Sequence, residues 1–246
     1  MRNFLLFNNP KVLENYILSG KPLDVIDRTT DYTLFMFICD KILNTQPYKP
    51  WSNLAMKMLD YTPEQINLKY ANRDGITALI LVCGVDVDVS LKIISYGSMA
   101  INLNAVETDN KMNALMYALT KETEEVANEL LDSPQIVTSL QNINNNGYTP
   151  LMLACEEGLE EIALKMLEGF PSASLNLFQK NNRGQTAFDI AIEQDQMGVY
   201  RSINELMDEI QIMDNIISDH SELPMPWAHK EMPAIPNLPE DVININ

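Results

Sequence analysis

The chain has 246 residues, of which 46% are hydrophobic, enough to bury one large core or two small ones. Its formal net charge of -17 repels phosphate backbones and argues against a nucleic-acid partner. No apolar run approaches the ~20 residues of a membrane span, and the three widely spaced cysteines make no disulfide framework. The apolar run from Phe4 to Phe7 is too short for a secretion signal. We therefore expect an intracellular, cytoplasmic protein without a membrane partner.

The first predicted element, residues 1–28, is a pair of N-terminal capping helices. Val12, Tyr16 and Ile17 recur at the spacing of one helix face, and residues 23–26 form a second short apolar run. A cap of this kind would give the end of a repeat array a polar outer surface.

One block of sequence then recurs five times. Its clearest copies read GITALILVC at 75–83 and GYTPLMLAC at 147–155. We anchor each copy on its threonine, or on the asparagine that replaces it. The anchors are Thr33, Thr77, Asn113, Thr149 and Thr186. The last three intervals between anchors are 36, 36 and 37 residues, and the first is 44 because of an insertion around 45–51. This regularity indicates a repeat architecture.

Each block is followed by a second apolar segment with the spacing of one helix face. These segments are residues 54–59, 87–94, 126–131, 162–167 and 199–207. The Asn- and Gly-rich stretches between units, such as 72–75 and 144–147, predict tight turns. The strips before them, such as 66–70 and 175–178, look extended. Each unit is thus predicted to be a turn, two helices and an extended finger.

This pattern resembles the ankyrin repeat, whose hallmark Thr-Pro-Leu-His-x-Ala opens the first helix. The copy anchored on Thr149 matches best, with Pro150, Leu151 and Ala154 at the hallmark positions. The resemblance spans roughly residues 29–215 and implies an all-α solenoid of about five helix-turn-helix units with short β-like fingers.

The hallmark His is absent from every unit. Its place is taken by Met36, Ile80, Met116, Met152 and Asp189. In the family this side chain ties neighbouring loops together, so its absence predicts a less rigid stack that is held more by apolar contact.

The predicted organisation has three parts: the capping helices 1–28, the ankyrin-repeat domain 29–218, and a Pro-rich extended tail 219–246. The units cover about 29–70, 71–106, 107–142, 143–179 and 180–218. Prolines forbid a regular helix in the tail, but Met225 and Trp227 are too apolar for a pure spacer. A strap folded over the last repeat, a linear motif for a partner and plain disorder all stay open.

Cys39, Cys83 and Cys155 each lie six residues after an anchor threonine. In the ankyrin family this position holds a small residue that faces the stack. Because free Cys behaves there as a small buried hydrophobe, we predict a structural role rather than a metal or redox cluster.

Groups suited to catalysis are scarce. The chain has two histidines, His220 and His229, and both follow the last unit. The densest carboxylates, near Glu156 and Glu160, lie at predicted helix starts, where they favour the helix dipole. No loop has EF-hand spacing or the lysine and glycines of a phosphate loop. We expect no catalytic site, cofactor or metal, and hence a protein that is not an enzyme.

The ankyrin resemblance places a protein partner on a concave face of finger tips and first-helix edges. The family's variable positions lie four, three and one residues before each anchor, and seven and eight after it. Here they are Arg73, Asp74, Ile76, Asp109, Asn110, Met112, Lys121, Asn145, Asn146, Tyr148, Glu156, Glu157, Asn182, Arg183 and Gln185. Tyr148, Met112 and Ile76 would be its exposed apolar anchors. Packing of Tyr148 on the neighbouring finger is the alternative.

The predicted function is protein binding by an adaptor or inhibitor. The charge of -17 leaves open an acidic mimic or escort of a basic protein, and a structural scaffold subunit is a further alternative. A viral or microbial effector acting in the host-cell cytoplasm also stays open, as does self-association through the solenoid end or the tail.

Overall fold

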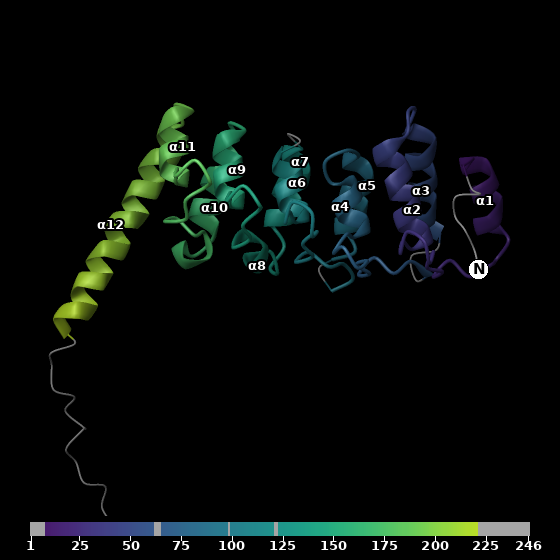
Figure 1. The fold of residues 1–246 in the computed structure, drawn as a ribbon, viewed down its shortest axis with the longest axis horizontal. Helices are drawn as coiled ribbons and strands as arrows, with labels where there is room; N and C mark the ends of the chain where they lie inside the picture. The colour runs from purple at the N-terminus through teal and green to yellow at the C-terminus, as the bar shows by residue number, and fades with distance from the viewer. Residues whose placement is uncertain (1–7, 62–64, 98, 121–122, 221–246) are drawn as a thin grey trace, which may run out of the picture. The chain divides into compact units, whose positions relative to one another are not determined.

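The computed structural model describes residues 8–61, 65–97, 99–120 and 123–220, with side chains as far as residue 212. The first unit, residues 1–207, is a row of helix pairs (Figure 1). Its helices are α1 (Pro10–Leu18), α2 (Leu34–Asn44), α3 (Lys49–Tyr61), α4 (Ala78–Val82), α5 (Val87–Ile94), α6 (Ala114–Thr120), α7 (Glu124–Leu131), α8 (Val137–Leu140), α9 (Pro150–Glu156), α10 (Glu160–Gly169), the 3-10 helix η3 (Ser172–Ser174), α11 (Ala187–Glu193) and the start of α12 (Met197–His220). The predicted all-α solenoid is confirmed.

The anchor residues are helix N-caps. Thr149 Oγ1 accepts a hydrogen bond from the N–H of Met152 at 3.2 Å, and Thr33 and Thr77 bond the third residue of their helices in the same way. Asn113 substitutes for threonine because its Oδ1 accepts the equivalent bond at 2.9 Å. An N-terminal N–H has no partner inside its own helix, so these side chains fix where each first helix begins.

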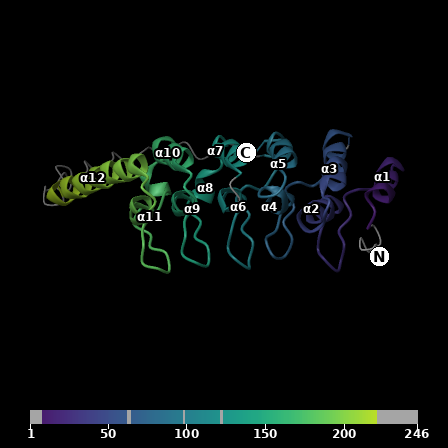
Figure 2. The same ribbon diagram turned by 90° about the horizontal axis from the view of Figure 1, so that it is seen from above.

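The core lies between successive pairs. First helices stack on first helices, as α2 on α4 and α6 on α9, and second helices stack on second helices, as α5 on α7. Every residue of the five-residue helix α4 is buried. A helix that is apolar all round needs cover on all sides, and the units before and after it provide that cover. Figure 2 shows the first and second helices in two separate rows.

The position six residues after the anchor faces the next unit. Cys39, Cys83, Leu119 and Cys155 occupy it and are fully buried, whereas Ile192 in the last unit is 49% exposed. The difference follows from the repeat itself, since within the described residues no further first helix follows α11. The sequence register therefore identified a stacking position.

The three cysteines are free and buried. Burial raises the pKa of Cys39, and it raises the pKa of Cys83 and Cys155 to about 12. Two of their backbone carbonyls also accept hydrogen bonds from the next unit. Thr123 Oγ1 donates to the Cys83 carbonyl and Gln196 Nε2 donates to the Cys155 carbonyl, both at 2.9 Å. The structural role predicted for these residues agrees with their burial.

The predicted second capping helix is wrong. Residues 10–18 form α1, but residues 23–26 are not helical, and Ile26 makes an isolated antiparallel bridge with Thr33. Pro22 removes a backbone donor, and a four-residue run is too short to compensate for helix nucleation. The segment is instead held by pairing with the loop that precedes α2.

The predicted extended strips are also wrong, because residues 68–69 and 175–178 are turns. The N–H of Tyr70 bonds the Asn67 carbonyl at 3.2 Å, and that of Gln179 bonds the Asn176 carbonyl at 2.9 Å. Asn176 has φ 49°, a left-handed conformation that Asn tolerates. Over four or five residues, an alternation of apolar and polar side chains does not distinguish a strand from a turn.

The second unit begins at Asp208 and contains the part of α12 up to His220. The predicted border at residue 218 falls inside this helix. The Pro-rich tail predicted for 219–246 lies, from residue 221 on, outside the described residues. Within the described ranges, no helix is long and apolar enough to cross a membrane.

Candidate protein-binding face

Five loops, each closed by a backbone hydrogen bond of 2.9 or 3.0 Å, precede the first helices, and we call them fingers. Fingers 1 to 5 are residues 27–32, 72–76, 107–112, 144–148 and 181–185. The N–H of the first residue bonds the carbonyl of the last, as Asn144 does with Tyr148. Figure 2 shows the loops projecting from the side of the first helices.

Three fingers are built around an asparagine. Asn72, Asn144 and Asn181 each accept two main-chain N–H groups on Oδ1; those on Asn144 come from Asn146 and Tyr148, at 2.9 and 3.0 Å. A glycine with positive φ stands three residues after each asparagine. An Asn side chain that bonds its own loop forms an Asx turn, so part of the asparagine at the finger tips serves to form the turns.

Fingers 1 and 3 use a carboxylate instead. Asp27 accepts from the N–H groups of residues 29 and 30, and the Glu107 carboxylate accepts from those of residues 109, 110 and 112. These fingers are one residue longer, and Asp31 and Lys111 take the left-handed conformation, with φ 57° and 58°. The inner group has only to accept hydrogen bonds, so a carboxylate replaces the amide.

Hydrogen bonds join each finger to the next. The N–H of Thr108 bonds the Asp74 carbonyl at 2.9 Å, and that of Asn145 bonds the Asn110 carbonyl at 3.0 Å. Fingers 4 and 5 are joined between Asn182 N–H and the Asn146 carbonyl at 2.9 Å. The four fingers from finger 2 to finger 5 therefore form a ladder.

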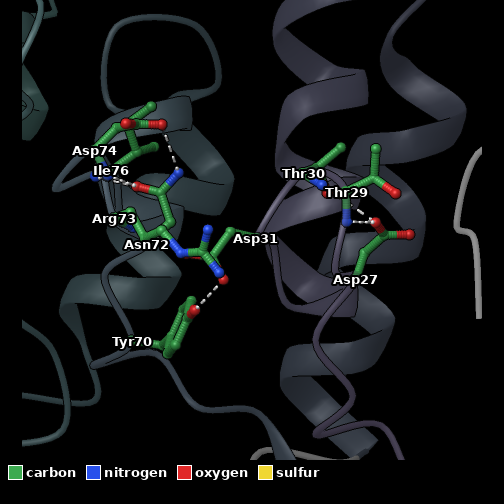
Figure 3. Close-up of polar contacts among 9 residues, drawn as sticks. All are labelled: Asp27, Thr29, Thr30, Asp31, Tyr70, Asn72, Arg73, Asp74 and Ile76. Carbon is green, nitrogen blue, oxygen red and sulfur yellow. Dashed lines mark hydrogen bonds and ion pairs between the residues drawn. The ribbon is translucent and has the colours of Figure 1, made fainter. Parts of the chain in front are cut away.

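The junction between fingers 1 and 2 is made by the side chain of Asp31. The Asp31 carboxylate accepts from the Tyr70 hydroxyl and from the Arg73 N–H, both at 3.0 Å, as Figure 3 shows for Tyr70. The Arg73 guanidinium lies 3.6 Å from the same carboxylate. The prediction that the stack depends mainly on apolar contact without the hallmark His is therefore incomplete, because these polar contacts link the loops.

Two fingers approach the next one closely at a glycine. A Cβ on Gly75 would lie 2.0 Å from the Val106 carbonyl oxygen, and one on Gly147 would lie 2.9 Å from the Asn181 Cα. A Cβ on Gly184, in the last finger, would have no such neighbour within 4 Å among the residues that the structure describes. Glycine is needed at the first two positions for space as well as for its positive φ.

The structure brings most of the predicted partner-binding residues to the fingers and the adjoining helix ends. Nine are exposed: Arg73, Asp74, Asp109, Asn110, Asn145, Asn146, Glu157, Asn182 and Arg183. Four are half-buried: Ile76, Met112, Glu156 and Gln185. Lys121 lies outside the described residues.

The prediction of Tyr148 as an exposed anchor is wrong, because the residue is only 8% exposed. Burial raises the pKa of its hydroxyl, and the charge of Glu156 raises it further. Glu156 itself bonds Arg183 at 3.1 Å, which connects helix α9 to the tip of finger 5. Tyr148 is thus part of the support beneath this face.

Finger 1 has an equivalent arrangement that the sequence reasoning missed. Tyr32, one residue before Thr33, has a raised pKa because of burial first, and then because of the charges of Asp40 and Asp74. Asp40 lies seven residues after the anchor, as Glu156 does in its unit. The register positions minus one and plus seven would have found both residues.

Basic side chains on the second helices are engaged in ion pairs between units. Lys92 pairs with Asp60 at 2.7 Å, and Lys165 pairs with Asp132 at 2.7 Å. Figure 2 shows the second helices α3, α5, α7 and α10 in the row away from the fingers. In the described part of the chain, no three His, Cys, Asp or Glu side chains are grouped as metal ligands.

Comparison with known proteins identifies the same repeat. The family model described as ankyrin repeat matches residues 146–181, the unit anchored on Thr149. No curated protein sequence matches the chain.

Solved structures show the same fold. A chain of the complex between the predatory endopeptidase Bd0816 from Bdellovibrio bacteriovorus and the immunity protein Bd3460 matches with a TM-score of 0.54 and 21% identity, over 78% of this chain and 90% of that one. The ankyrin repeat domain of Bcl-3, of the IkappaB family, matches with a TM-score of 0.54 and 16% identity, over 80% and 78%. At these identities the likeness is one of fold, and function must be argued from the site.

Proposed function

We propose that this chain, an ankyrin-repeat protein by sequence and fold, is a non-catalytic adaptor or inhibitor that binds a partner protein on its finger face. The observation that carries the proposal is the ladder of hydrogen bonds between fingers 2 and 5. It joins loops whose tips, from Arg73 to Arg183, are exposed. Binding to loops that are already ordered loses less conformational entropy than binding to mobile ones.

The proposed contact surface is polar at its tips and partly apolar at its base. Asp109, Asn110 and Asn146 would supply hydrogen bonds at the tips, and the half-buried Ile76 and Met112 would supply apolar area. Interfaces commonly combine an apolar centre with a polar rim. Tyr148 supports this surface from below, since it lies beside the Glu156–Arg183 pair.

An acidic mimic or escort of a basic protein is the second candidate function, and a structural scaffold subunit is a separate alternative. The net charge of -17 favours the mimic or escort, as do the lysines engaged in ion pairs on the second helices. Binding by charge alone weakens steeply with salt, whereas binding through shaped apolar contacts does not. The three buried free thiols are consistent with an intracellular site of action.

The test uses full-length chain as bait for proteins from a cell lysate, at low and high salt. Asp109→Arg changes a finger tip, and Glu129→Arg makes the same type of charge reversal on the exposed surface of α7. We expect a discrete partner that survives high salt, binds at least about tenfold more weakly to the finger variant, and binds the α7 variant normally. Equal retention by both variants would overturn the finger-face proposal. Equal loss, with every protein released by salt, would favour the acidic mimic.

A further inference from the structure

The last helix is longer than its place in the repeat requires. The second helix of the preceding unit, α10, has 10 residues, whereas α12 has 24. The compact repeat unit ends at Met207, so residues 208–220 of α12 belong to the second unit. Their length calls for an explanation other than stacking on the previous helix pair.

The sequence of these residues is amphipathic at the register of a helix. At about 100° per residue, its apolar residues fall within an arc of about 160°. They are Ile210, Ile212, Met213, Ile216 and Ile217. Ile212 is 57% exposed. Residues 210, 213 and 217 have the i, i+3, i+7 spacing by which a helix enters an apolar groove.

At this register, an aspartate stands next to the apolar arc on each side. Asp214 falls about 40° beyond Ile210, and Asp219 falls about 20° beyond Ile212, at the same rotation per residue. No Lys or Arg occurs in residues 202–229, so both borders are acidic. A partner that buries the apolar arc must therefore bring positive charge to both of its edges.

We propose that residues 208–220 are a docking helix for a partner protein that presents an apolar groove rimmed by Lys or Arg. A second copy of this chain fits less well, because like charges would meet across the interface. An anionic lipid surface is disfavoured for the same reason, since membrane-surface helices carry Lys and Arg on their polar face. This helix is a second binding element, and it does not depend on the finger face.

The test measures fluorescence anisotropy of a labelled designed helical peptide on addition of the full chain. One peptide is an antiparallel helix pair with Ile and Leu in the groove between its helices and Lys along both rims, and a second has the same groove with Glu along the rims. We expect the Lys peptide to bind at least about tenfold more tightly than the Glu peptide. The variant Ile210→Asp/Ile217→Asp should lose at least about tenfold in affinity.

The control variant Asn215→Asp/Ser218→Asp adds the same two charges to the polar face and should bind the Lys peptide at least as well as the natural chain. Exchanging the rim charges in Asp214→Lys/Asp219→Lys should weaken the preference for the Lys peptide, and a thermal melt checks that each variant folds. Equal binding by the Ile variant and the natural chain would overturn the proposal. So would sedimentation of the natural chain as a dimer that the Ile variant dissociates, because the occupant would then be a second copy.

Discussion

Gly75 and Gly184 occupy the same position in two fingers and differ only in what lies next to them. Their φ angles are +74° and +81°. A Cβ at Gly75 would lie 2.0 Å from the Val106 carbonyl oxygen, far inside the 3.0 Å limit that real Cβ atoms respect, whereas among the described residues nothing lies within 4 Å of one at Gly184. Replacing each glycine by alanine therefore separates backbone strain from steric conflict.

The two substitutions should differ by several kcal/mol. A left-handed residue with a Cβ costs about 1–2 kcal/mol, which is the loss of unfolding free energy that we expect for Gly184→Ala. Gly75→Ala adds a clash with the backbone of Val106, directly before finger 3, for which overpacking costs about 1–3 kcal/mol. Moving that finger also breaks the 2.9 Å bond between Thr108 N–H and the Asp74 carbonyl, which is worth about 1 kcal/mol. The expected total is about 3–6 kcal/mol.

Urea unfolding followed by circular dichroism measures both values, with the natural chain as reference. Repeat arrays unfold in a single step only when neighbouring units are well coupled, so the slope of the transition should be compared as well as its midpoint. Equal destabilisation by the two substitutions would refute the reasoning, because it would mean that the gap between fingers 2 and 3 tolerates a methyl group. A larger effect at Gly184 would refute it more strongly.

Two further predictions concern the caps and the thiols. Thr149→Ala removes the Oγ1 that accepts from the Met152 N–H and should lower the unfolding free energy by about 1 kcal/mol. Thr149→Ser keeps a hydroxyl and should restore most of this stability. An alanine variant with an unchanged urea midpoint would contradict the capping role of Thr149. The pKa values of Cys83 and Cys155 are raised from 9.0 to about 12, so above pH 9 the unfolded thiols ionise while the folded ones stay protonated. Stability should therefore fall as pH rises from 9 towards 12, by roughly 1 kcal/mol per pH unit for each thiol. Urea midpoints at several alkaline pH values check this, and a Cys83→Ala/Cys155→Ala variant with an undiminished slope would contradict it.

The repeat and its helices follow from the sequence because their causes are local. Thr149 caps its helix through the N–H of Met152, only three residues further along the chain. Cys155 lies six residues after Thr149, at the position that faces the next unit. Because these positions recur in each unit, the period of the repeat can be recognised in a single sequence. The two incorrect elements, residues 23–26 and the strips before the fingers, are short apolar runs whose length is below what periodicity can resolve.

The environment of the predicted binding residues depends on the neighbouring unit. Tyr148 and Met112 occupy the same position before their anchors, yet Tyr148 is buried beside the Glu156–Arg183 pair and Met112 is half-exposed. Which side chain stays accessible depends in part on residues of the next unit, such as Arg183 and Asn181 beside Tyr148, and no local pattern encodes those contacts.

By itself, the sequence determined the repeat architecture, the helix starts, the stacking position of the cysteines and the acidic charge, because each depends on residue type at a fixed spacing. Only the tertiary structure decided that Asp31 and the ladder link the fingers, that Gly75 must leave room for finger 3, and that Tyr148 supports the surface from within. These features arise where one unit meets the next, and the energy of such a contact depends on both surfaces at once.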